Sequence, residues 1–115
     1  MSYYDIMVAA VPTANRDAYL EHAAEMGAVF REHGADQLVD CWGDEVPGGE
    51  VTSFPMAVQC KDDETVAVGW IRWPSKQAHD TAWEKIMKDP RMAPDAGKMP
   101  FDGKRMIFGS FDLLR

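Results

Sequence analysis

The chain has 115 residues, of which 46% are hydrophobic and 27% are charged, and its formal net charge is −7 at pH 7. Length and composition are those of one globular domain, and the acidic excess disfavours nucleic acid as a partner, because phosphate backbones are bound by clusters of Lys and Arg. No apolar run approaches the roughly 20 residues of a membrane-spanning helix and the N-terminus lacks signal-peptide features, so we expect a cytoplasmic protein without membrane association.

The first predicted elements are a strand over residues 3–11 and a helix over residues 15–33. The strand is apolar and contains β-branched residues, and Pro12 ends it. In the following segment apolar side chains recur at helical spacing while charged side chains fall on the opposite side, which predicts an amphipathic helix that Gly34 ends. The stripe expected to face the core consists of Tyr19, Leu20, Ala23, Met26, Gly27 and Phe30.

The middle of the chain contains two further predicted strands, over residues 35–44 and 65–73. The polar loop over residues 45–55 is long for a compact domain, and connections of this length are often functional loops or lids. Residues 56–60 fit a short strand as well as a helical turn, so both assignments stay open.

The last part of the chain predicts a second helix over residues 76–89, capped by Ser75, and a closing strand over residues 105–114. The turn before this strand is Asp102-Gly103, since glycine enters positive-φ conformations without the penalty of a Cβ atom. The core stripe of the second helix is expected to be Ala78, His79, Ala82, Trp83, Ile86 and Met87.

The order of these elements is β-α-β-β-α-β, which predicts an α+β fold with an antiparallel sheet, a single ferredoxin-like domain over residues 1–115. Two helices cover one face of such a sheet, yet the strand over residues 65–73 is apolar on both of its faces. Burial of apolar area stabilises by about 25 cal/mol per Å², and a single chain has no further layer for the second face. We therefore expect a homodimer in which the exposed faces of two sheets pack together.

Several motifs resemble the DUF1428 or YbaA-like family of bacterial proteins, and together they span nearly the whole chain. They are Cys41-Trp42 with Asp44, Val46 and Pro47; Glu50, Val51-Thr52, Phe54 and Ala57-Val58; Glu64-Thr-Val, Trp70-Ile71 and Pro74-Ser75-Lys76; Asp89-Pro90-Arg91-Met92; and the stretch from Met99 to Ile107. The resemblance implies the dimeric α/β-barrel superfamily, which includes cofactor-free monooxygenases, haem-degrading enzymes and chlorite-dismutase-like proteins. The family itself has no assigned reaction, so the resemblance implies a fold without a substrate.

Two positions of the second predicted helix depart from the family pattern. His79 stands where relatives commonly have Arg, and Trp83 stands where Asn is common. If this helix face lines a pocket, the ligand of this protein differs from that of its relatives.

The sequence lacks the spacing patterns of metal, phosphate and hydrolase sites. His22, His33 and His79 are isolated, without HxH or HExxH spacing, and no GxSxG motif is present. Cys41 and Cys60 do not form a CxxC pair, and in a reducing compartment we expect both to be free structural thiols. Neither a metal nor another cofactor is expected.

Four charged side chains near predicted strand ends and turns stand out: Asp44, Arg91, Asp102 and Arg105. In one hypothesis they form an anion- or carbonyl-binding edge beside an apolar cavity, because a guanidinium suits carboxylates and enolates and a desolvated carboxylate can abstract a proton. In the other, Asp102 pairs with Arg91 or Arg105 and merely fixes the turn and the dimer seam. The candidate ligand-binding residues are Trp42, Asp44, Trp70, His79, Arg91, Asp102 and Arg105.

Two functions follow as alternatives. In the first, the protein binds a small aromatic or enolisable ligand in a cavity, as a binder or as a cofactor-independent enzyme. Tryptophans would stack the ligand, Asp44 or His79 would move a proton, and Arg105 would hold the developing negative charge. In the second, the protein is a non-catalytic dimeric structural or interaction module whose apolar residues all serve the core and the interface.

Overall fold

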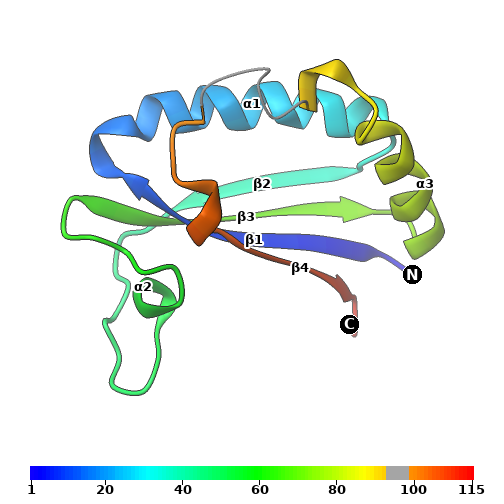
Figure 1. Ribbon diagram of the computed structural model, residues 1–115. Helices are drawn as coiled ribbons and strands as arrows, with labels where there is room; N and C mark the ends of the chain where they lie inside the picture. Colours follow the sequence, from blue (N-terminus) through cyan, green and yellow to red (C-terminus); the bar gives the residue numbers. More distant parts are fainter. Residues whose placement is uncertain (93–98) are drawn as a thin grey trace.

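The computed structural model describes residues 1–92 and 99–115. Its centre is an antiparallel sheet of four strands in the order β2-β3-β1-β4 (Figure 1). The strands are β1 (Tyr3–Pro12), β2 (Gln37–Trp42), β3 (Glu64–Trp73) and β4 (Ile107–Asp112), and the α-helices are α1 (Arg16–Glu32), α2 (Phe54–Ala57) and α3 (Lys76–Ile86). Short 3₁₀ turns span Thr13–Asn15, Pro90–Met92 and Gly103–Arg105. The predicted mixed fold with an antiparallel sheet is confirmed.

Strand pairing divides the sheet into two faces, because successive side chains of a strand point to opposite sides. On β1, one face carries Asp5, Met7 and Ala9, and we call it the helix-covered face because α1 and α3 both lie on it (Figure 1). Gly69 of β3 lies opposite Met7 and also opposite Asp40 of β2, so these residues share that face. The other side, which we call the second face, carries Tyr4, Ile6, Val8 and Ala10 of β1.

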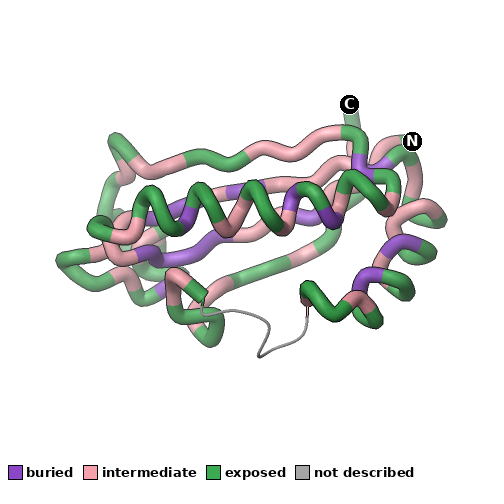
Figure 2. Tube along the Cα trace, turned by 90° about the horizontal axis from the view of Figure 1, so that it is seen from above, coloured by how far each residue is buried: buried purple, intermediate pink, exposed green. Residues whose placement is uncertain are grey.

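The core of the helix-covered face forms where α1 and α3 meet the sheet. Val29 of α1 packs with Ile86 of α3 and with Trp73 at the end of β3, and all three are buried. Seen from above in Figure 2, buried segments lie on the strands beneath α1 and along parts of α1 and α3. Ser75 caps α3 as predicted, since its hydroxyl accepts a hydrogen bond from the backbone N–H of Ala78.

Two residues predicted to face the core are exposed instead. Leu20 is 56% exposed, because it is adjacent to Tyr19 in sequence and therefore lies about 100° around α1 from that buried residue. Met87 is 75% exposed because α3 ends at Ile86, which leaves Met87 at the C-cap beyond the last turn. The predicted stripes were wrong at these two positions.

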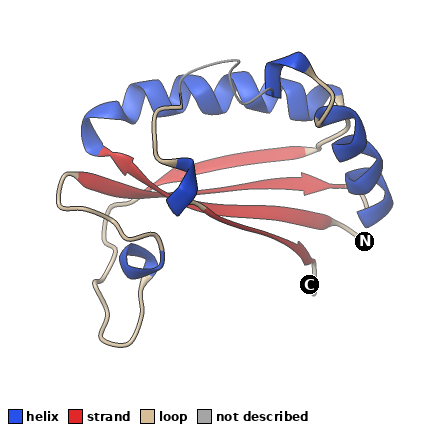
Figure 3. Ribbon diagram, in the orientation of Figure 1, coloured by secondary structure: helices blue, strands red, loops and turns tan. Residues whose placement is uncertain are grey.

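One end of the second face is covered by α2 and its flanking loops, which lie on the opposite side of the sheet from α1 and α3 (Figure 3). Val58, just after α2, is buried against Val8, Ala10 and Val66. The open question about residues 56–60 is settled as a helical turn, which Ser53 caps by accepting from the backbone N–H of Met56. The expectation that this chain has no layer for the second face was therefore wrong at this end.

Among residues 1–92 and 99–115, the second face is left partly open along β4. Ile107 and Phe111 of β4 are 44% and 52% exposed. They belong to the second face because they pair in register with Val8 and Tyr4 of β1. Where the structure describes the chain, none of its helices combines the length and the apolar character needed to cross a membrane.

Candidate functional site

A cavity of about 700 Å³ lies between α1 and the helix-covered face of the sheet. Its roof comes from α1, including Tyr19 and Phe30, and its floor from the strands, including Asp5, Asp40 and Gly69. Trp83 of α3 closes one part of the wall. This volume falls in the range of sites that take small organic molecules.

The walls of the cavity are mainly aromatic rings and methionine thioethers. Large apolar rings give contact area, and flexible thioethers adapt to irregular ligand shapes. The rings belong to Tyr19, Phe30, Trp70, Trp83, Phe101 and Phe108, and the thioethers to Met7, Met26, Met92, Met99 and Met106.

The rings form two groups. Around Trp83, the ring centroids of Phe30 and Phe108 lie 5.5 Å and 6.4 Å away. Around Phe101, the centroids of Tyr19 and His22 lie 5.7 Å and 6.4 Å away. The cavity therefore offers aromatic surface near α3 and, separately, near the first turns of α1.

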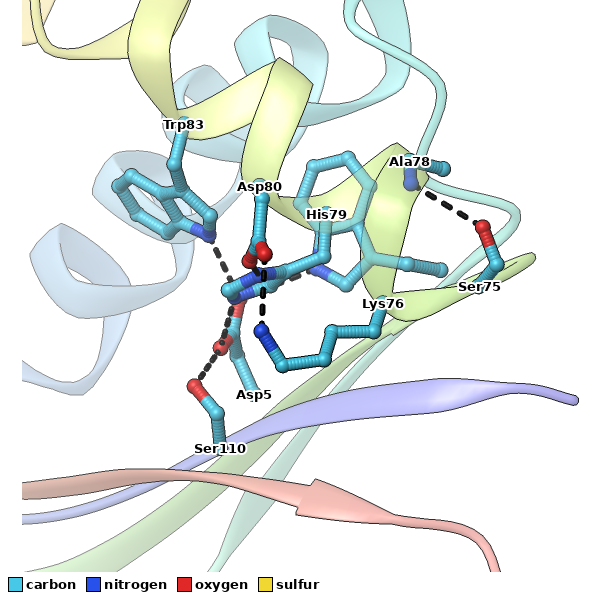
Figure 4. Close-up of polar contacts among 9 residues, drawn as sticks. Asp5, Ser75, Lys76, Ala78, His79, Asp80, Trp83 and Ser110 are labelled. Carbon is cyan, nitrogen blue, oxygen red and sulfur yellow. Dashed lines mark hydrogen bonds and ion pairs between the residues drawn. The ribbon is translucent and has the colours of Figure 1, made fainter.

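Asp5 lies at the cavity floor, and four hydrogen-bond donors surround its fully buried carboxylate. Oδ2 accepts from the indole N–H groups of Trp73 and Trp83, at 3.0 Å and 2.8 Å. Oδ1 accepts from the Ser110 hydroxyl at 2.6 Å and lies 2.9 Å from Nε2 of His79 (Figure 4). These contacts fill the acceptor capacity of an ionised carboxylate, so Asp5 holds the indole of Trp83 in the cavity wall.

His79 connects this buried carboxylate to the surface. Its Nε2 faces Asp5 and its Nδ1 lies 2.7 Å from Oδ1 of Asp80, so both ring nitrogens point at carboxylate oxygens (Figure 4). A doubly protonated ring satisfies both contacts, because each nitrogen then donates. The second oxygen of Asp80 accepts from the exposed ammonium of Lys76 at 2.8 Å.

Asp40 is a carboxylate of the sheet that faces the cavity without a partner in the described part of the chain. Within residues 1–92 and 99–115, no side chain or backbone group donates a hydrogen bond to it and no cation pairs with it. Burial raises the pKa of Asp40 above its usual range. Burial, with the nearby charge of Asp40 as a smaller cause, also raises the pKa of Tyr19 to about 12.

The three aromatic or histidine candidates from the sequence, and Trp83, lie in different places. His79 reaches the cavity only through Asp5, and Trp42 packs behind Tyr19 with ring centroids 6.0 Å apart. Trp70 borders the cavity, but its indole N–H donates to Gln37 at 3.3 Å and its neighbours on the second face include Ile6. Trp83, one of the two departures from the family pattern, is the tryptophan that lines the cavity beside Asp5.

Of the four charged candidates, the structure brings together Asp102 and Arg105, whereas Asp44 and Arg91 lie apart from them. Arg91 lies at the cavity rim and pairs with Glu32 at 2.7 Å and Asp89 at 2.6 Å. Asp44 is exposed in the turn after β2. The predicted pair of Asp102 with Arg105 is present, at 3.0 Å.

The guanidinium of Arg105 is occupied by protein groups. It donates to both oxygens of Glu64, at 2.6 Å and 2.7 Å, and to the backbone carbonyl of Gln59 at 2.9 Å. The hydrogen bonds from Arg105 lower the pKa of Glu64 to about 2, and those from Arg91 likewise lower the pKa of Asp89 to about 2. Both arginines therefore have their charge compensated within the chain.

Asp5 and Asp40 are the functional candidates that sequence reasoning missed. Each is an acidic residue whose strand neighbours on the same face are apolar, Met7 for Asp5 and Leu38 and Trp42 for Asp40. An acidic residue within an otherwise apolar strand face is the signal that could have identified both.

Metal binding has no cluster of ligands to support it in the described part of the chain. There, no three His, Cys, Asp or Glu side chains lie close enough together to hold a metal ion. Cys41 and Cys60 are both free thiols, and burial raises the pKa of Cys60. A raised pKa makes a thiol less reactive at neutral pH.

Comparison with known proteins finds similarity over nearly the whole chain. Residues 2–103 match the family described as "Protein of unknown function (DUF1428)". The "Uncharacterized protein YbaA" of Escherichia coli strain K12 is 49% identical over 114 residues, which cover 99% of this chain and 97% of the relative. The protein of the same name from Shigella flexneri gives the same values.

Proposed function

The chain belongs to the DUF1428 family of proteins of unknown function, and we propose that it binds a small aromatic or enolisable molecule in the cavity between α1 and the sheet. The observation that carries this proposal is the cavity of about 700 Å³ with its aromatic and thioether walls. Apolar pockets with few polar groups take such ligands, since apolar contact supplies affinity and the polar groups fix orientation.

If the ligand is enolisable, Asp40 is the group that would accept its proton. Its carboxylate faces the cavity, and burial raises the pKa of Asp40, which makes it a stronger base than an ordinary aspartate. The sequence alone suggests Asp44 or His79 for this role, with Arg105 as the anion holder. Asp44 is exposed in the turn after β2 and His79 reaches the cavity only through Asp5, so we assign the proton-accepting role to Asp40. Arg105 is bound to Glu64 and Asp102 and is not free to hold the anion.

The second candidate function is a dimeric structural or interaction module, and the bare part of the second face favours it. In this proposal the single domain is ferredoxin-like and two copies pair through their sheets as a dimeric α/β barrel. Ile107 and Phe111 are exposed there, next to a shallow apolar hollow lined in part by Tyr4, Ile6 and Trp70. The two proposals are compatible, because the cavity and this patch lie on opposite faces of the sheet.

Binding is tested by substituting two neighbouring alanines with phenylalanine, one that lines the cavity and one that does not. Ala23 of α1 lines the cavity, whereas Ala24 is exposed and does not. Naphthalene-1-methanol, titrated against the tryptophan fluorescence of the protein, serves as an uncharged aromatic probe. We expect A23F to lower its affinity by about tenfold or more, because the new ring occupies ligand space, and A24F to change it by less than about twofold.

Saturable binding that A23F and A24F affect equally would place the probe outside the cavity. An absence of saturable binding for this probe and for its amino and carboxylate analogues would overturn the binding proposal.

A further inference from the structure

We propose that the cavity selects an aromatic amine, whose protonated amino group pairs with the Asp40 carboxylate while its ring packs against the aromatic and methionine walls. This inference rests on the proposed function, since it assigns a ligand class to the same cavity. It is carried by the placement of Asp40, by the pairing of Asp5 and Arg91 with other groups of the chain, and by the aromatic rings that line the cavity.

The sheet leaves a space that the Asp40 carboxylate occupies. Asp40 of β2 pairs in register with Gly69 of β3. A Cβ atom built on Gly69 would lie 3.0 Å from Oδ1 of Asp40, which is closer than an ordinary contact between such atoms. The carboxylate therefore lies over the bare backbone of Gly69, at the cavity floor, where it is accessible from the cavity.

This carboxylate differs from Asp5 on the cavity floor and from Arg91 at the rim in lacking a partner among the described residues. Asp5 has four donors, and Arg91 at the rim pairs with Glu32 and Asp89. No donor or cation meets Asp40 among residues 1–92 and 99–115. Asp40 is exposed toward the open cavity, so a cationic group of a ligand can reach its carboxylate without displacing a protein partner.

The charge around the cavity disfavours the opposite choice, an anionic ligand. Glu25 of α1 lines the cavity and adds a second carboxylate without a partner among the described residues, and the whole chain carries a formal charge of −7. The one arginine that borders the cavity is compensated by two carboxylates. A negative field in a cleft raises the local concentration of cations and lowers that of anions.

The ring of Tyr19, which lines the same cavity, also suits an ammonium group. Tyr19 lies close enough for the charge of Asp40 to contribute to its raised pKa of about 12, so its hydroxyl stays protonated near neutral pH. Its ring has Phe101 and Trp42 at centroid distances of 5.7 Å and 6.0 Å. Aromatic faces attract cations through their quadrupole, and the tyrosine oxygen can accept a further hydrogen bond from an ammonium group.

The test uses three probes that share one ring system and differ in charge. They are 1-naphthylmethylamine, naphthalene-1-methanol and 1-naphthoate, titrated calorimetrically into the purified full chain at neutral pH. We expect the amine to bind at least about tenfold more tightly than the alcohol, and the carboxylate to bind most weakly. This order follows from pairing of the ammonium with Asp40 and repulsion of the carboxylate by Asp40 and Glu25.

Two variants assign the preference to Asp40. D40N removes the charge at the cavity floor, and D17N makes the same chemical change at a side chain that is 98% exposed on α1. We expect D40N to remove the roughly tenfold preference for the amine while the affinity for the alcohol changes by less than about twofold. We expect D17N to leave the affinities for the amine and for the alcohol unchanged. Circular dichroism checks that each variant is folded.

The outcomes separate the two proposals. If the alcohol binds as tightly as the amine, or if folded D40N keeps the preference, the amine inference is overturned while the cavity proposal stands. If none of the three probes binds, the proposed function itself fails. Should D40N not fold, the ranking of the three probes on the unmodified protein still decides, because an amine that binds no better than the alcohol overturns the inference.

Discussion

At the scale of single residues, Asp5 has the most demanding environment in the described part of the chain, where it is the only polar or charged residue that is buried. Its partners come from β3, α3 and β4, through Trp73, Trp83 and Ser110, so one carboxylate joins β1 to three other elements. A buried charge is tolerated only when such donors replace water. The network therefore ties the end of the sheet to α3.

We predict that D5N strongly destabilises the protein. Asparagine keeps one acceptor oxygen but places an NH₂ group against donors, which leaves buried donors without acceptors. The expected loss is roughly 3 kcal/mol in the free energy of unfolding, measured by urea denaturation. D62N, at an exposed turn residue, is the control and should cost less than about 0.5 kcal/mol. A similar loss of unfolding free energy in D5N and D62N would show that the four donors around Asp5 do not contribute to stability.

At the scale of elements, Arg105 connects three segments that are distant in sequence. It lies in the 3₁₀ turn before β4 and donates to Glu64 at the start of β3 and to the carbonyl of Gln59 after α2. The side chains of Arg105 and Glu64 are 15% and 4% exposed, so this pair is far less hydrated than a surface ion pair. It holds the segment around α2 next to the sheet.

This ion pair predicts a specific acid sensitivity. Because the pKa of Glu64 is lowered from 4.5 to about 2 in the folded protein, the pair contributes stability above the ordinary carboxyl pKa and loses that contribution as pH falls from about 4.5 to about 2. We expect E64Q to have a lower melting temperature than the unmodified protein at pH 7 and a smaller difference from it at pH 2.5.

The control for this series is E21Q, at an exposed residue of α1. Its melting temperature should follow that of the unmodified protein over the same pH range. If the difference between E64Q and the unmodified protein were independent of pH across this range, the assignment of the lowered pKa to the Arg105 pair would be wrong.

The elements themselves could be predicted from the sequence because their signals are local. Ser75 and Gly34 mark helix ends within one turn of the chain, and the capping bond of Ser75 and the positive φ of Gly34 are both present. The site could not be predicted in this way. Ser110 donates a hydrogen bond to Asp5, which is 105 residues away in sequence. The carboxylate of Asp40 has room at the sheet only because the pairing of β2 with β3 places Gly69 opposite it. Both relations depend on strand register rather than on local pattern.

At the scale of the whole molecule, the second face combines a covered end with a bare apolar patch around Ile107 and Phe111. We predict that the chain is a dimer through this patch and that F111K shifts it to a monomer, because a lysine charge would be buried in the interface. Analytical ultracentrifugation at low micromolar concentration measures this.

The matched control for the dimer is L20K, which introduces the same charge at an exposed apolar residue on α1, away from the second face. L20K should sediment as the unmodified protein does. A monomeric unmodified protein, or equal behaviour of F111K and the unmodified dimer, would contradict an interface at this patch.

Because the cavity lies on the helix-covered face, its position in the predicted dimer is fixed by which face forms the interface. Two copies joined back to back through their second faces would carry their cavities on opposite outer surfaces, with both sheets between them. Neither copy would contribute residues to the cavity of the other. Ligand binding to one cavity would leave the affinity of the other cavity unchanged. A binding titration would therefore follow a simple hyperbola even in a stable dimer.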